Sequence, residues 1–252
     1  FPLPPLLLHA LLTGSSEYLT RWAQSMPDPG DRGTFLNFTA SHDGIGLRPA
    51  EGLIPEEEQN RMLKKMEVFG GCVSTRTRPD GSKSPYEINI AWFDALKGTD
   101  RGFDKRQTER FLCSQTLMMS LKGIPAFYIH SFTATPNDRE RVAETGKYRS
   151  INRKRWDYPK FLARLDDPDQ KAHQVFYELK RLIRIRRAEP AFHPDSSQKV
   201  LQLGNSLFAI QRQHESGDTI WSISNVTDKP QNFTPPIPTQ KQGLTDLIDN
   251  QT

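Results

Sequence analysis

An imidazole and a carboxylate stand side by side directly after a short apolar run of the chain. His42 and Asp43 lie in the polar segment 39–44, which follows the run 34–38 (TFLNF). Such a pair can hold neighbouring hydroxyl groups of a sugar ring. A carboxylate beside the anomeric carbon also stabilises the positive charge of an oxocarbenium-like transition state. The pair is equally compatible with an Asp that caps a helix beside a surface His, so spacing alone leaves both interpretations open.

A second imidazole, His130, also follows an apolar run, 124–129 (IPAFYI). It could face the same site, or it could be a hydrogen-bonded structural histidine. Asp94 and Glu140 are further carboxylates, and each is expected on a solvated helix or loop. The remaining histidines show no spacing typical of metal ligands, so no metal site is expected among His9, His173, His193 and His214.

Helices and strands are expected to alternate through most of the chain. Pro55, the glutamates 56–58 and the glycines 70–71 delimit a helix over 55–69. Apolar spacing predicts two more helices, and the runs 34–38 and 124–129 have the length of buried strands. Those two helices lie at 107–121 and 167–188. The other expected elements are helices at 6–12 and 17–26, a hairpin of 72–77 with 86–92, a polar loop over 130–160, and strands at 200–203, 207–212 and 219–224.

This order predicts an α/β fold: the C-terminal part of a (β/α)8 TIM barrel followed by a small, incomplete antiparallel β-sandwich domain. We expect the last two to three βα units of the barrel in residues 1–192, and a truncated β-domain in residues 193–252. A barrel alone takes about 250 residues, so the chain is too short to be a whole enzyme of this type. Active sites of such barrels lie where the strands end, which is where His42 and Asp43 are expected.

Composition argues against several other classes of protein. The net charge of +4 comes from 34 basic and 30 acidic residues that form no long basic block, so no nucleic acid partner is expected. No apolar stretch is long enough to span a membrane. Cys72 and Cys113 are too few for a disulfide framework, and reduced thiols predict a cytoplasmic protein. The apolar start 1–8 lacks a basic leader, which is typical of the interior of a longer protein.

Five strings of the chain resemble the sucrose phosphorylase-like subfamily of glycoside hydrolase family 13, within the α-amylase clan. The string 35–46 (FLNFTASHDGIG) is similar to the fourth signature region of that clan. The other four are 48–53 (RPAEGL), 85–89 (PYEIN), 123–126 (GIPA) and 149–153 (RSINR). Five matches in the family's order are far more specific than any one of them. The resemblance covers the barrel-like part and extends only weakly into the β-domain.

The resemblance implies reversible, retaining transfer of a glucosyl group from an α-glucoside to phosphate, which gives α-glucose 1-phosphate. Such enzymes use an Asp nucleophile, a Glu as acid and base, and a third carboxylate that braces the glucose. By motif match Asp43 is that third carboxylate, the stabiliser of the transition state, and His42 contacts the same ring. Arg149 matches the arginine that holds the far side of the ring. Tyr86 and Glu87 match the loop that shapes the acceptor and phosphate site.

One position departs from the sucrose-specific relatives, which carry Asp-Leu-Tyr-Gln where this chain has 84–87 (SPYE). A carboxylate at Glu87 disfavours a nearby phosphate unless a cation pairs with it. The strings RPAEG and SPYE look more like the branch that acts on glucosylglycerate or glucosylglycerol.

The resemblance also predicts what the chain needs and what it lacks. The nucleophile and the acid/base are expected upstream of Phe1, so the chain alone is predicted to be inactive. Inorganic phosphate is the expected co-substrate, no cofactor is expected, and a homodimer is left open. Two alternatives remain: a hydrolase of the same clan, of the α-glucosidase or amylase type, and a non-catalytic carbohydrate-binding remnant.

Overall fold

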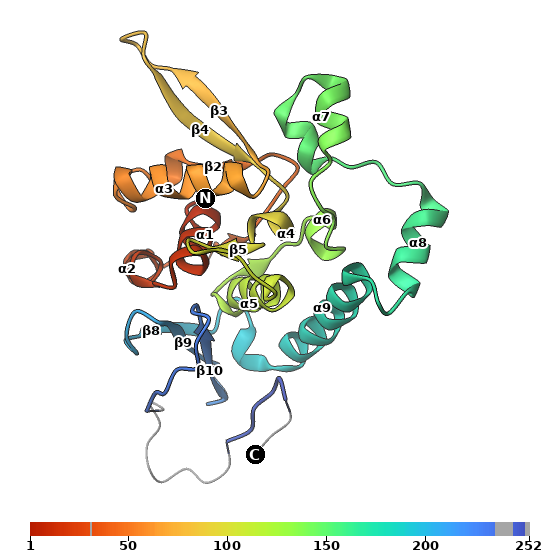
Figure 1. Ribbon diagram of the computed structural model, residues 1–252. Helices are drawn as coiled ribbons and strands as arrows, with labels where there is room; N and C mark the ends of the chain where they lie inside the picture. The colour runs from red at the N-terminus through yellow and green to blue at the C-terminus, as the bar shows by residue number, and fades with distance from the viewer. Residues whose placement is uncertain (31, 235–243, 250–252) are drawn as a thin grey trace.

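The computed structural model describes residues 1–30, 32–234 and 244–249, which form an α/β arrangement of helices and small sheets (Figure 1). Its helices are α1 (Leu3–Thr13), α2 (Glu17–Ser25), η1 (Arg48–Ala50), α3 (Glu56–Val68), α4 (Trp92–Ala95), α5 (Gln107–Ser120), α6 (Ile129–Phe132), α7 (Arg139–Thr145), η2 (Tyr148–Asn152), α8 (Tyr158–Asp166), α9 (Lys171–Ala188) and η3 (Pro190–Phe192). Its strands are β1 (Leu36–Asn37), β2 (Ile45–Gly46), β3 (Cys72–Thr77), β4 (Lys83–Asn89), β5 (Gly98–Thr99), β6 (Gly102–Phe103), β7 (Ile124–Pro125), β8 (Ser197–Leu201), β9 (Leu207–Gln213) and β10 (Thr219–Asn225).

Helix α1 lies at the centre of the apolar core. It is apolar on all sides, and its residues from Leu3 to Leu12 are buried, as expected of a helix surrounded by other elements. The same cluster of buried side chains takes in α3, α5 and α9, and it continues into β9 through Phe208 and Ile210. The small sheet β8–β9–β10 therefore packs against the helices. None of the described helices is long and apolar enough to cross a membrane.

Strands β1 and β7 pair in parallel, with Leu36 opposite Ile124 and Asn37 opposite Pro125. The prediction that both runs are buried strands is wrong in two respects. Each strand has only two residues, and the side chains of Leu36 and Ile124 are 57% and 49% exposed. Asn37 is the buried member, and its amide donates to the carbonyl oxygen of Lys122 at 3.0 Å. The described part of the chain therefore covers only about half of each of these two apolar side chains.

The expected hairpin is present, and it projects from the body of the molecule (Figure 1). β4 pairs antiparallel with β3 and also with the short β2, so the hairpin base belongs to a three-stranded sheet. The second strand covers 83–89 and not 86–92. Trp92 begins helix α4 instead, where its indole is buried and donates to the hydroxyl of Ser114 at 2.9 Å.

The segment 130–160 is not the polar loop that was expected. It contains α7, η2 and part of α8, and it directly follows the start of α6. The side chain of Asp138 caps α7 by accepting from the backbone of Arg141, and Asp157 caps α8 by accepting from the backbone of Lys160. Polar composition concealed these helices. Asp94 was also misjudged, because it is buried and accepts from the backbone of Asn137 at 2.9 Å.

The C-terminal region forms one antiparallel sheet in the order β10–β9–β8. All three expected strands are present, and β8 begins three residues earlier than expected. Helix α9 begins at Lys171 and not at 167, because 167–170 form a turn in which the backbone of Gln170 donates to Asp167. The boundary between residues 192 and 193 remains a prediction. Residues 235–243 and 250–252 of the expected β-domain lie outside the described residues.

Candidate active site

The loop that carries His42 and Asp43 begins just beyond β1 and is fixed by a distant segment of the chain. The amide of Asn152 donates to the carbonyl oxygens of Ser41 at 2.6 Å and of Asp43 at 3.2 Å. Arg153 adds a third bond, from Nε to the carbonyl oxygen of His42 at 2.8 Å. The hydroxyl of Ser41 accepts from the backbone of Asp43 at 3.1 Å and tightens the turn. The loop backbone is thus held at the ends of the parallel strands.

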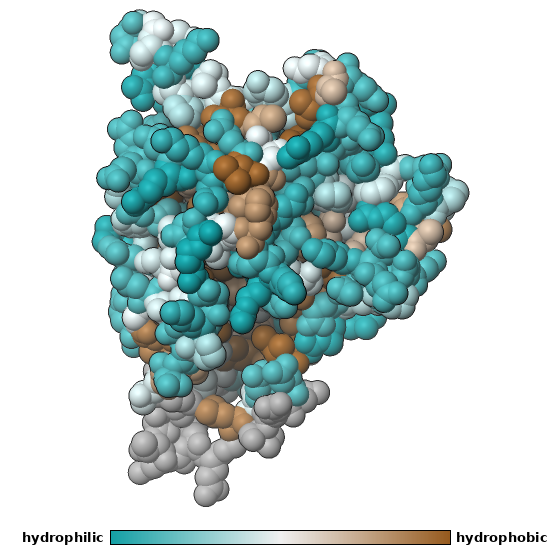
Figure 2. Space-filling model, viewed as in Figure 1, coloured by the Kyte–Doolittle hydropathy of each residue, from teal (hydrophilic) through white to brown (hydrophobic). Residues whose placement is uncertain are grey.

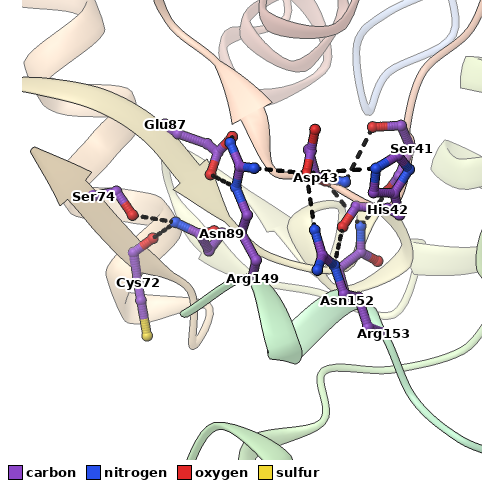
Figure 3. Close-up of polar contacts among 10 residues, drawn as sticks. All are labelled: Ser41, His42, Asp43, Cys72, Ser74, Glu87, Asn89, Arg149, Asn152 and Arg153. Carbon is purple, nitrogen blue, oxygen red and sulfur yellow. Dashed lines mark hydrogen bonds and ion pairs between the residues drawn. The ribbon is translucent and has the colours of Figure 1, made fainter. Parts of the chain in front are cut away.

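Four charged side chains meet above this loop (Figure 3). Oδ1 of Asp43 accepts from Nη2 of Arg153 at 2.9 Å, and it forms an ion pair with Nη1 of Arg149, also at 2.9 Å. Arg149 also donates from Nε and Nη2 to the two carboxylate oxygens of Glu87, again at 2.9 Å each. These bonds with Glu87 raise the pKa of the Arg149 guanidinium above its ordinary value. Two anions and two cations therefore balance within one cluster of ion pairs and hydrogen bonds.

The six predicted site residues do not all meet. Asp43, Arg149 and Glu87 are in direct contact. His42 is at the edge: its Nε2 lies 3.8 Å from Oδ1 of Asp43, and its side chain is 68% exposed. Tyr86 precedes Glu87 on β4 and is 38% exposed.

His130 lies outside the charged cluster. It is buried in α6, where its ring packs edge-on against Tyr128 with centroids 5.1 Å apart. Burial lowers the pKa of the His130 imidazole below its ordinary value. Nδ1 of His130 is buried and has no hydrogen-bond partner among the residues that the structure describes. A neutral ring is therefore favoured in these surroundings.

Sequence reasoning missed three residues that organise the site. Asn152 and Arg153 lie in the string RSINR, but only Arg149 was given a role. A helical turn brings positions i, i+3 and i+4 to one side, which could have identified all three. The third is Tyr128, whose hydroxyl donates to the carbonyl oxygen of Asn152 at 2.7 Å. Burial is the main cause that raises the pKa of the Tyr128 phenol, and Asp43 acts in the same direction.

Gly44 allows the loop to pass directly over the hairpin. A Cβ atom at this position would lie 2.4 Å from the carbonyl oxygen of Ile88 and 2.7 Å from Cγ of Glu87. Real Cβ atoms do not approach other atoms so closely. The contact explains why glycine follows Asp43, and it holds the Asp43 loop against the side chain of Glu87.

The cluster can bind a polyol or an anion through fixed charged groups. A carboxylate accepts from hydroxyl groups, while guanidinium groups donate to hydroxyl, carboxylate or phosphate oxygens. Within the described ranges, no three His, Cys, Asp or Glu side chains are arranged to hold a metal ion. The geometry suits recognition of a neutral or anionic ligand rich in oxygen.

Known proteins similar to this chain are glucoside phosphorylases. No protein-family model matches the chain. It is 37% identical over 227 residues to a glucosylglycerate phosphorylase from Escherichia coli (strain K12), covering 90% of this chain and 40% of the relative. It is 37% identical over 233 residues to a glucosylglycerate phosphorylase from Allomeiothermus silvanus, covering 92% of this chain and 41% of the relative.

A solved structure shares the fold. The crystal structure of sucrose 6F-phosphate phosphorylase from Thermoanaerobacter thermosaccharolyticum matches with a TM-score of 0.74 and 20% identity, covering 89% of this chain and 42% of that one. At this identity the likeness concerns the fold alone. Together with the sequence similarity, it confirms the resemblance drawn from the five strings. The chain is a homologue of the glucosylglycerate phosphorylases in the sucrose phosphorylase-like subfamily of glycoside hydrolase family 13, and it spans about two fifths of their length.

Proposed function

We propose that this chain is the C-terminal part of a retaining α-glucoside phosphorylase. The complete protein would transfer a glucosyl group from an α-glucoside to inorganic phosphate and release α-glucose 1-phosphate. The chain spans 40% of the Escherichia coli relative, so the nucleophile and the acid/base are assigned to the part of the protein that it does not include. No cofactor enters this proposal.

The observation that carries the proposal is the anchoring of Asp43 by Arg149 and Arg153 beside the ends of two parallel strands. A third carboxylate must keep its place while charge develops at the anomeric carbon, because preorganised groups stabilise a transition state without rearranging. Asp43 would brace the glucose and stabilise that charge. His42 would contact the same ring from the exposed edge, and Arg149 would hold its far side.

The exposed strand pair supports a partial barrel in residues 1–192. Leu36 and Ile124 are 57% and 49% exposed on β1 and β7, as expected for strands whose further neighbours come from elsewhere in a longer protein. Hydrophobic side chains also gather along a hollow strip down the middle of one face, between hydrophilic flanks (Figure 2). Residues 193–252 would form the appended β-domain, incomplete in this chain.

Glucosylglycerate is the α-glucoside that we favour as substrate, because both relatives at 37% identity carry that name. Glucosylglycerol and sucrose are the next candidates. Tyr86 and Glu87 would shape the site for acceptor and phosphate. The carboxylate of Glu87 is paired with Arg149, so the repulsion that an unpaired carboxylate exerts on phosphate does not apply. A cytoplasmic location completes the proposal.

The test compares this chain with the longer polypeptide that contains the upstream residues. Each is incubated with glucosylglycerate and phosphate, and the release of glucose 1-phosphate is followed. We expect release from the longer polypeptide only, and a loss of many powers of ten in its Asp43→Asn variant. Release by the chain alone would overturn the division of catalytic groups. Glucose release that ignores phosphate would identify a hydrolase.

A further inference from the structure

Both carboxylate oxygens of Glu87 accept hydrogen bonds from one guanidinium group. Oε2 accepts from Nε of Arg149 and Oε1 accepts from Nη2, at 2.9 Å each. Two parallel charge-assisted bonds of this kind fix both planar groups relative to each other. The side chain of Glu87 is only 6% exposed, so little of its carboxylate remains accessible to a ligand.

The third nitrogen of Arg149 is turned toward the other carboxylate. Nη1 lies 2.9 Å from Oδ1 of Asp43. A guanidinium group is rigid and planar, so fixing two of its nitrogens also fixes the direction of the third. Arg153 contacts the same Oδ1, and the side chain of Asp43 is 37% exposed. Glu87, Arg149 and Asp43 thus form a chain of contacts that ends at a partly exposed carboxylate (Figure 3).

The backbone around Glu87 supports the same arrangement. Gly44 packs so closely on Glu87 that a Cβ atom there would lie 2.7 Å from its Cγ. On the neighbouring strand, Ser74 is in register with Glu87 in the antiparallel ladder. The side chain of Glu87 is therefore confined by packing as well as by its ion pair.

We propose that Glu87 is a positioning residue that acts through Arg149, which it orients toward Asp43, and that it binds neither the acceptor nor phosphate. The inference deepens the proposed function, and its catalytic part rests on that function. It also revises the expectation that Glu87 contacts the substrate. Glu87 stands where the sucrose-specific relatives carry Gln. On this proposal, the difference between Glu and Gln changes how Arg149 is held in place.

The first test measures the orientation of Arg149 in this 252-residue chain. The exchange of arginine Nε–H protons with solvent is followed by NMR in the wild type, Glu87→Gln and the control Glu17→Gln. Glu17 pairs with Arg21 on the exposed surface of α2. We expect Arg149 to exchange about tenfold more slowly than Arg21, and Glu87→Gln to remove that difference. Glu17→Gln should leave Arg149 unchanged. Slow exchange that persists in Glu87→Gln overturns the proposal.

The second test is a double-mutant cycle in the longer polypeptide, with Glu87→Gln, Arg149→Lys and the double variant. Misplacing a catalytic group by about 1 Å can cost 100-fold, so we expect Glu87→Gln to lower kcat by about 10- to 100-fold. The KM for phosphate should change by less than about threefold, and the double variant should be no slower than Arg149→Lys, because coupled residues are non-additive.

Independent, multiplicative effects would mean that Glu87 touches the substrate, and so would an effect confined to the KM for phosphate. Either result overturns the proposal. If the longer wild-type polypeptide carries out no phosphorolysis at all, the proposed function fails. The exchange measurement still decides whether Glu87 orients Arg149, so the two failures can be told apart.

Discussion

An arginine and a glutamate form an ion pair at each end of the β3–β4 hairpin. The two pairs differ in geometry, in the exposure of the glutamate and in their contact with a second carboxylate. At the outer end, Nη2 of Arg76 contacts Oε1 of Glu51 at 3.0 Å, with the side chains 35% and 54% exposed. At the base, Arg149 contacts both oxygens of Glu87; the arginine is 41% exposed, but the glutamate is only 6% exposed. Arg149 at the hairpin base also contacts a second carboxylate, that of Asp43. Among the described residues, Arg76 contacts no second carboxylate.

Burial and geometry, more than the presence of two charges, decide whether an ion pair affects stability and side-chain orientation. An exposed pair is hydrated and screened, so it adds little to stability. A buried pair gains little over well-packed apolar residues, yet breaking it is expensive because one charge is left without a partner. The ion pair at the hairpin base therefore acts mainly by orienting Arg149. Four substitutions test how far the two ends of the hairpin differ.

Arg149→Met should have the largest effect, because it strands the buried carboxylate of Glu87. We expect a loss of about 3–5 kcal/mol in the free energy of unfolding, measured with urea. The double variant with Glu87→Gln should recover part of that loss, since the uncompensated charge is then gone. If Arg149→Met lowers the free energy of unfolding by less than about 1 kcal/mol, the Arg149–Glu87 pair behaves like an ion pair on the surface.

Gly44→Ala tests whether the loop must lie directly on the hairpin base. The added Cβ atom meets the carbonyl oxygen of Ile88, and backbone cannot move as a flexible side chain does. Overpacking of this kind typically costs about 1–3 kcal/mol, again measured by urea unfolding. Gly46→Ala is the matched control, because a Cβ atom there makes only an ordinary contact, 3.8 Å from Cδ of Pro49. A silent Gly44→Ala would contradict the close contact.

Asn152→Ala removes the amide that holds the Asp43 loop. Two carbonyl oxygens, those of Ser41 and Asp43, lose their donor. We expect a loss of about 1–2 kcal/mol in the free energy of unfolding, because unsatisfied polar groups carry a desolvation penalty. Asn152→Asp distinguishes the contribution of the hydrogen bonds from that of packing. It keeps the size of the side chain and removes the N–H groups that donate. Full stability in both variants would exclude an anchoring role.

Glu51→Gln should have the smallest effect. The pair with Arg76 is exposed at the outer end of the hairpin, so we expect a change of at most about 1 kcal/mol. The difference from wild type should shrink further in about 1 M salt, where the Debye length is about 3 Å. A change as large as that of Arg149→Met would erase the contrast between the two ends.

Local signals predicted much of the fold. The helix of 55–69 was correct because proline, acidic and glycine residues punctuate it at both ends, and the hairpin followed from its alternating strands and turn. The capping residues Asp138 and Asp157 carry an equally local signal for α7 and α8. It was outweighed by the polarity of the segment, so a uniform polar composition is a poor guide to loops.

Features that depend on distant contacts were not predictable in the same way. The sequence motif brought Asp43 and Arg149 into one hypothesis, but it could not show that Glu87 pairs with Arg149 across 62 positions of the chain. The exposure of Leu36 is similar, since an apolar run does not reveal what covers it. Periodicity describes a segment, whereas a site depends on which segments meet.

The bonds from Asn152 to the Asp43 loop join positions 109 and 111 residues apart. A ribosome adds about 5–20 residues per second, so several seconds separate the synthesis of the loop from that of its anchor. Contacts of such long range form late, because the entropy of closing the intervening chain must be overcome first. The loop therefore cannot reach its final conformation before residue 152 has been synthesised, so its ordering reports that this part of a nascent chain has emerged and folded.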